Sequence, residues 1–145
     1  MKTLYIIAAL IFSMGVSYSC FGQKEHNIWY FGCEAGVSFN TQTPTALADG
    51  MICTNEGCSS ICNSNGQLLF YTDGSTIYNR NHEVMQNGAD LSGGWTSTQA
   101  ALIVKQPEHN EKYYVFTTAN EAQLPGLRYS GVDMSLDCGL GASMR

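Results

Sequence analysis

Three cysteines stand close together in the chain, where they could form disulfides or help to hold a metal. Cys53, Cys58 and Cys62 follow a C-x4-C-x3-C spacing. Zinc sites favour two close cysteine pairs, or a cysteine pair with a histidine pair, so this spacing disfavours a zinc site completed by His82. Exported proteins favour disulfides, and the three cysteines could pair across adjacent strands. Spacing alone does not decide the pairing, and burial as free thiols is also open.

One acidic residue, Asp73 in Thr72-Asp73-Gly74-Ser75, could serve a calcium site or catalysis. Calcium takes about six to eight oxygen ligands, and Asp73 is the only charged residue of this segment. A pair with Glu56 would suit glycoside hydrolysis only at a carboxyl separation of roughly 5 to 9.5 Å. An Asp-Gly turn explains the segment better, because Asp bonds its own backbone and Gly accepts a positive φ. We therefore predict no metal, no cofactor and no enzymatic activity.

Aromatic side chains are the remaining candidates for chemistry, through ligand stacking. Most are expected to fill interfaces between strands. Trp95 differs, because it lies in a Gly-rich polar loop with Leu91 as its only apolar neighbour. We predict Trp95 as the residue that contacts a ligand. Three histidines share no ligand spacing and are expected to be solvated: His26, His82 and His109.

The elements that would position these residues begin after a secretory signal peptide. Lys2 precedes an apolar run over residues 4–16, and small residues follow. The run is shorter than the roughly 20 residues that span a bilayer. We predict a signal peptide over residues 1–22, with cleavage after Ser19 or Gly22, and export to the extracellular space or outer cell surface.

Cys20 raises the alternative that the exported protein is anchored to a membrane by a lipid instead of being released. Acylation there would anchor the protein to a membrane face, although Ser17 stands where a lipobox usually has an aliphatic residue. A periplasmic location is also open.

The charge of the chain excludes one class of partner. The 145 residues carry a net charge of −5, and loss of Lys2 with the signal peptide makes it −6. Nucleic-acid binding calls for clustered Lys and Arg, and the sequence has no such cluster. No segment after the signal is apolar enough to span a membrane.

An aromatic strand motif recurs along the chain. It appears as Tyr30-Phe31-Gly32, then forty residues later as Phe70-Tyr71-Thr72-Asp73-Gly74, and again as Tyr114-Val115-Phe116-Thr117-Thr118. A period of roughly 40 to 50 residues is typical of stacked four-stranded blades. We predict an all-β fold in which residues 23–145 form a partial β-propeller-like domain of about three blades. A β-sandwich is the alternative.

Strands and turns account for almost all of residues 23–145. The loop over residues 86–97 is expected to be flexible and exposed. Gly131 is a candidate bulge, and residues 139–145 show no capping element. Turns are expected at Asn63–Gly66 and Asp73-Gly74. Strands are expected over 27–31, 37–39, 59–62, 67–72, 75–79, 100–104, 113–118 and 127–134.

Longer motifs resemble a known family. They lie over residues 27–32, 35–40, 54–58, 65–74, 78–82, 97–100 and 127–130. Together they resemble the N-terminal region of large surface proteins from gliding, type IX-secreting bacteria. In those proteins β-propeller domains precede PKD-type modules and a C-terminal sorting domain linked to gliding motility. The downstream modules are absent, so the chain reads as a truncated fragment. Only Cys58 belongs to the family pattern; the cysteines that depart from it are Cys33, Cys53, Cys62 and Cys138.

The resemblance implies a function without catalysis. We expect a secreted or cell-surface β-propeller segment that acts as an adhesion or interaction scaffold for an unidentified protein or glycan. The alternative is a propeller that binds or hydrolyses glycans, with Trp95 and loop carboxylates near one end of the ring.

Overall fold

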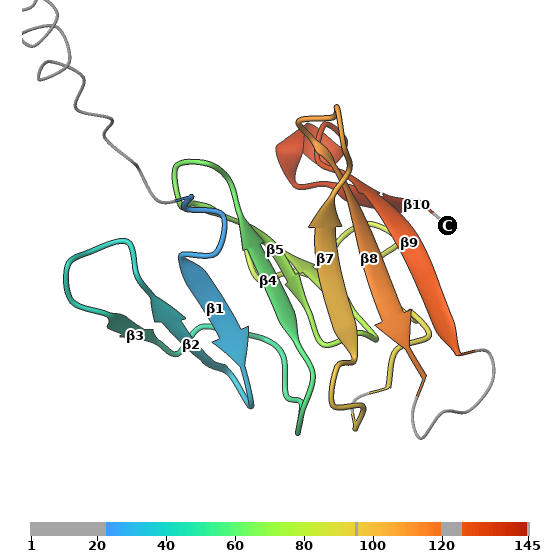
Figure 1. Cartoon of the computed structure of the whole chain (residues 1–145), viewed down its shortest axis with the longest axis horizontal. Coiled ribbons are helices and arrows are strands. Elements are labelled where there is room, and N and C mark those ends of the chain that lie inside the picture. Colours follow the sequence, from blue (N-terminus) through green and yellow to red (C-terminus); the bar gives the residue numbers. More distant parts are fainter. Residues whose placement is uncertain (1–22, 95, 120–125, 145) are drawn as a thin grey trace, which may run out of the picture.

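The computed structural model describes residues 23–94, 96–119 and 126–144, which form three antiparallel sheets (Figure 1). This part of the chain has no α-helix, and the predicted all-β class is confirmed. Sheet 1 contains β1 (Ile28–Phe31), β2 (Ala35–Ser38) and β3 (Thr45–Leu47). Sheet 2 contains β4 (Ser59–Cys62), β5 (Leu68–Thr72) and β6 (Ile77–Asn79). Sheet 3 contains β7 (Ala101–Lys105), β8 (Lys112–Thr118), β9 (Leu127–Asp133) and β10 (Ala142–Met144).

Each sheet is a meander in which strands that follow one another in sequence also pair. The tight turns of sheet 2 lie where they were predicted. Asn63 Oδ1 accepts hydrogen bonds from the N–H groups of Asn65 and Gln67, and Gly66 has a φ of 82°. Asp73 Oδ1 accepts from the N–H of Ser75 at 2.8 Å, as the Asp-Gly turn requires.

Three details of the strand prediction were wrong. Gly131 is not a bulge, because it pairs in register with both Tyr114 and Met144. The irregularity lies in β4, between Ile61 and Cys62. Two short strands, β3 and β10, were not foreseen, since three residues are too few to show a period. β10 follows a 3₁₀ helix, Asp137–Gly139, so the segment predicted to be uncapped adds a strand to sheet 3.

The loop over residues 86–97 was predicted to be exposed, and its described part is exposed at residues 86, 87, 89, 90 and 96 but buried at residues 88, 91 and 94. Leu91 is buried in the core, and its N–H donates to the Ser75 carbonyl at 2.8 Å. Gly93 donates to the Gly74 carbonyl and Gly94 to the Thr118 carbonyl. Glycine lets the two backbones approach closely, and the loop thereby joins the β5–β6 turn to sheet 3.

The three sheets stack in chain order around two apolar interfaces. Successive residues of β5 face opposite neighbours, so Tyr71 packs toward sheet 1 and Phe70 toward sheet 3, and both are fully buried. The interface of sheets 1 and 2 contains Tyr30, Ile52 and Tyr71. The interface of sheets 2 and 3 contains Ile61, Phe70, Ile77, Met85, Leu91, Ile103, Tyr113, Val115, Val132 and Met134.

The first strands of the three sheets lie next to one another. β4 contacts both β1 and β7, and Figure 1 shows sheets 1 and 3 on either side of it. Two serines of β4 join the strands: Ser60 Oγ accepts from the Tyr30 N–H at 2.9 Å, and Ser59 Oγ accepts from the Ile103 N–H at 3.3 Å. No described sheet covers the far side of sheet 1 or of sheet 3, so the stack is open at both ends.

The disulfide differs from the pairing that the sequence suggested. Cys53 bonds to Cys33, whereas Cys58 and Cys62 belong to no disulfide. An antiparallel bridge brings the turn after β1 against the segment that follows β3, with the Thr54 N–H donating to the Gly32 carbonyl at 3.0 Å. Cys53 is thus a disulfide cysteine, as the sequence suggested, but its partner Cys33 lies outside the cluster, and Cys58 and Cys62 are free thiols.

Candidate functional site

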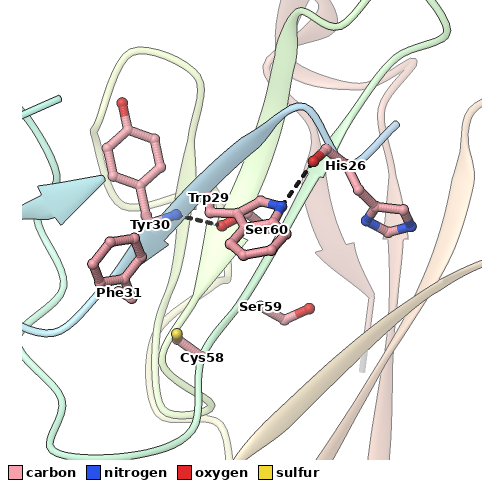
Figure 2. A pocket seen from close by; sticks show the side chains of 7 residues that line it. All are labelled: His26, Trp29, Tyr30, Phe31, Cys58, Ser59 and Ser60. Carbon is pink, nitrogen blue, oxygen red and sulfur yellow. Dashed lines mark hydrogen bonds between the residues drawn. The ribbon is translucent and has the colours of Figure 1, made fainter. Parts of the chain in front are cut away.

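A cleft of about 300 Å³ lies between β1 and β4 (Figure 2). We call it the β1–β4 cleft. Alternation along β1 turns Trp29 and Phe31 to the side opposite Tyr30, whose ring points away from the cleft. The cleft is lined by His26, Trp29, Tyr30, Phe31, Cys58, Ser59 and Ser60.

Two aromatic rings form the apolar part of this cleft. Trp29 is 51% exposed and Phe31 is 42% exposed. The Trp29 indole N–H donates to the His26 carbonyl at 2.7 Å, and its ring meets Phe39 edge-on with centroids 5.2 Å apart. These two contacts hold Trp29 in one orientation, so that a wide apolar face is preorganised toward solvent.

The polar part of the cleft offers hydroxyls and a thiol. Ser59 and Ser60 can donate as well as accept hydrogen bonds. Burial, followed by the charge of Asp73, raises the pKa of the Cys58 thiol. Cys58 is therefore protonated at neutral pH and is a poor nucleophile.

The lining of the cleft suits binding better than catalysis. Flat rings beside hydroxyls can stack on a sugar ring or receive an apolar side chain. The ionisable side chains of the lining are His26 and Cys58, and the raised pKa of the Cys58 thiol disfavours it as a nucleophile. The described residues also contain no group of three or more His, Cys, Asp or Glu that could hold a metal.

A polar network lies between sheets 1 and 2, on the other side of β1. The Tyr30 hydroxyl donates to Asp49 Oδ1 at 2.7 Å, and His82 Nε2 lies 3.5 Å from Asp49 Oδ2. The Tyr71 hydroxyl lies 3.0 Å from His82 Nδ1 and accepts from the Met51 N–H at 3.1 Å. The network ties the segment after β3 to sheet 2.

This row of tyrosine, histidine and aspartate has the order of a catalytic triad, but the tyrosine in the place of the nucleophile is buried. Tyr71 is fully buried, with its ring stacked between Tyr30 at 4.5 Å and Tyr78 at 5.4 Å. Burial raises its pKa, so Tyr71 is neither accessible nor readily ionised. The expectation of a solvated histidine was wrong for His82, whose side chain is only 24% exposed.

The Tyr30 hydroxyl makes the stability of the fold sensitive to alkaline pH. Burial raises its pKa well above the usual range, and the hydrogen bond to Asp49 raises it further. In the unfolded chain the tyrosine hydroxyl ionises near pH 10. The stabilisation from Tyr30 is therefore complete below that pH, and it is lost as the pH rises toward the pKa of Tyr30 in the folded state. We expect the free energy of unfolding to fall above about pH 10, and Tyr30→Phe to make that fall shallower.

Urea unfolding at pH 8 and pH 10.5 measures this dependence. Tyr30→Phe should also cost about 1 kcal/mol at pH 8 through the lost hydrogen bond. The control is Thr41→Ala, because Thr41 is exposed in the β2–β3 turn; it should lose as much stability as wild type between the two pH values. Equal losses of stability between pH 8 and 10.5 in wild type and Tyr30→Phe would contradict the assignment.

A second exposed surface covers the side of sheet 3 that faces away from sheet 2. We call it the outer face of sheet 3. The rings of Tyr114, Phe116 and Tyr129 lie within 6.1 Å of one another on it. A hollow of about 430 Å³ at one end is lined by Gln99, Leu102, Phe116, Thr118 and Leu127. The exposed apolar side chains of the outer face of sheet 3 are Leu102, Val104, Leu127, Tyr129 and Met144.

The structure tests only some of the predicted site residues. Trp95 lies outside the described residues, and its role stays a prediction. Of the clustered cysteines, Cys58 lines the cleft, Cys62 is buried and Cys53 is bonded. Sequence reasoning missed the cleft, because Ile28-Trp29-Tyr30-Phe31 is apolar throughout and does not reveal which face is exposed.

Comparison with known proteins identifies no relative. No family model, no curated protein and no solved structure matches this chain. Within the described residues, no helix has the length and apolar character needed to cross a membrane.

Proposed function

We propose that this protein is an exported, non-enzymatic β-propeller segment that acts as an interaction scaffold at the cell surface. The observation that carries the proposal is the open stack of sheets with an apolar, partly exposed face at each end. Proteins that act alone rarely expose contiguous apolar patches larger than a few hundred Å². Such faces are typical of protein interaction sites.

The arrangement of the sheets supports blades over a sandwich. Each sheet is a meander of consecutive strands, and the first strands of the sheets lie side by side through β4. Blades around an axis have this order. A sandwich with Greek-key connections would exchange strands between two sheets.

Site-specific photo-crosslinking on intact producing cells tests the scaffold function. A photoreactive residue replaces Phe31 in one variant and Tyr129 in another, one at each end of the stack. The control replaces exposed Thr41, in the β2–β3 turn. Protein adducts at positions 31 and 129, absent at position 41, are the expected result. No adduct at either end would overturn the proposal.

A glycan-binding function is the second candidate, favoured by the exposed indole of Trp29 beside the serine hydroxyls of the cleft. A glycan array with wild type and Trp29→Ala tests it. Retention of a glycan by wild type and its loss in Trp29→Ala would favour this candidate. Retention by neither protein would reject it.

Export is tested by the mass of the protein recovered from cells. We expect an N-terminus at Cys20 or at Gln23, which corresponds to cleavage after Ser19 or Gly22. An added acyl mass on Cys20 would identify the anchored form. An uncleaved chain in the cytoplasm would contradict export.

A further inference from the structure

The two ends of the stack resemble its interior interfaces in composition. Inside, aromatic rings meet across neighbouring sheets: Tyr30 on Tyr71, and Phe70 edge-on to Tyr113 at 5.5 Å. The outer face of sheet 3 carries Tyr114, Phe116 and Tyr129. The opposite end, which we call the outer face of sheet 1, carries Trp29, Phe31 and Phe39, with Val37 paired to Trp29. Each end is therefore suited to pack against another sheet.

The sheet 3 end exposes several large apolar side chains that lie next to one another. Leu127 is 68% exposed and Tyr129 is 66% exposed. Both lie on β9 among other apolar side chains, and the hollow beside them is lined by Leu102 and Phe116. The sheet 1 end presents the partly exposed rings of Trp29 and Phe31. Both ends are hollowed, the sheet 3 end beside Leu102 and Phe116 and the sheet 1 end at the β1–β4 cleft, which Trp29 and Phe31 line.

We propose that the outer face of sheet 3 packs on the outer face of sheet 1 of a second copy of this chain, and that two such contacts close a ring of two copies. The inference rests on the proposed scaffold function and names its partner. It extends the order within one chain, where sheet 1 packs on sheet 2 and sheet 2 on sheet 3. Contacts between unlike faces form closed rings when the rotation closes, and a ring of two copies leaves neither end face exposed.

The first experiment measures the mass of the purified protein, expressed as its full chain, by light scattering after size exclusion from about 1 to 100 μM. Wild type should have the mass of two copies. Trp29→Glu and Tyr129→Glu each place a charge on one end face, so either variant alone should weaken association at least tenfold. The control is Leu136→Glu, because Leu136 is exposed in the turn after β9 and is not one of the side chains that make up either end face; it should keep the wild-type mass.

Mixing the two variants separates unlike-face from like-face contact. A Trp29→Glu copy keeps its sheet 3 face and a Tyr129→Glu copy keeps its sheet 1 face, so an equal mixture should recover a two-copy species through one intact contact. Contact of sheet 3 with sheet 3 would instead leave Trp29→Glu fully associated, which would overturn the proposal. Trp29→Ser and Tyr129→Ser repeat the test if circular dichroism shows that a glutamate variant is unfolded.

Two further outcomes would overturn the ring. One is a monomeric wild type over the whole concentration range, and the other is a larger or fibrous assembly. A monomeric wild type or a larger assembly would leave the scaffold function standing. In either case the photo-crosslinks at positions 31 and 129 would show adducts with a different protein. Absence of those adducts would instead reject the scaffold.

Discussion

Phe70→Ala is expected to destabilise the fold by about 3 to 5 kcal/mol, enough to unfold a protein of ordinary stability. The Phe70 side chain is fully buried between sheets 2 and 3, with its ring edge-on to Tyr113. It lies on the central strand of sheet 2, opposite Ile61 on one side and Asn79 on the other. Removal of the ring leaves a cavity at the interface that holds the two sheets together.

Urea unfolding followed by circular dichroism measures this loss. Phe70→Leu should lose less than half as much, because it keeps most of the buried volume. Leu136→Ala is the control for apolar truncation, since Leu136 is 42% exposed, and it should change the free energy of unfolding by less than about 0.5 kcal/mol. Similar losses for Phe70→Ala and Leu136→Ala would contradict the assignment of the core.

Gly93→Ala is expected to cost about 3 kcal/mol, at the upper end of the range for overpacking. A Cβ at this position would lie 2.7 Å from the Gly74 Cα and closer still to the Gly74 carbonyl. These are backbone atoms of the β5–β6 turn, so no side chain can rotate out of the way. The loop must shift, which would break the hydrogen bond from the Gly93 N–H to the Gly74 carbonyl.

Gly131→Ala is the matched control for this substitution. Its Cβ would meet the terminal methyl of Met144 at 3.3 Å, which a flexible side chain can accommodate. We expect a change of less than about 1 kcal/mol, measured by urea unfolding beside Gly93→Ala. An equal effect of the two substitutions would show that residue 93 does not pack against the turn.

Local chemistry is sufficient to determine the strands and turns of sheet 2. Asn63–Gly66 and Asp73-Gly74 are tight turns because Asn and Asp bond the nearby backbone and Gly accepts a positive φ. The apolar run that ends at Thr72 forms β5 for a related reason, since a turn bounds it on each side. Each of these features depends on residues within a few positions of one another, so the sequence by itself predicts them.

The tertiary structure alone decided the disulfide partner and the candidate sites. Cys33 meets Cys53, and Tyr71 meets His82, only after separate sheets and loops have packed. Stacking also decided that Trp29 would remain exposed while Tyr30 was buried. The two side chains are both large and aromatic, so the sequence could not distinguish them. What separates them is which face of β1 sheet 2 covers, and that depends on residues far away in the chain.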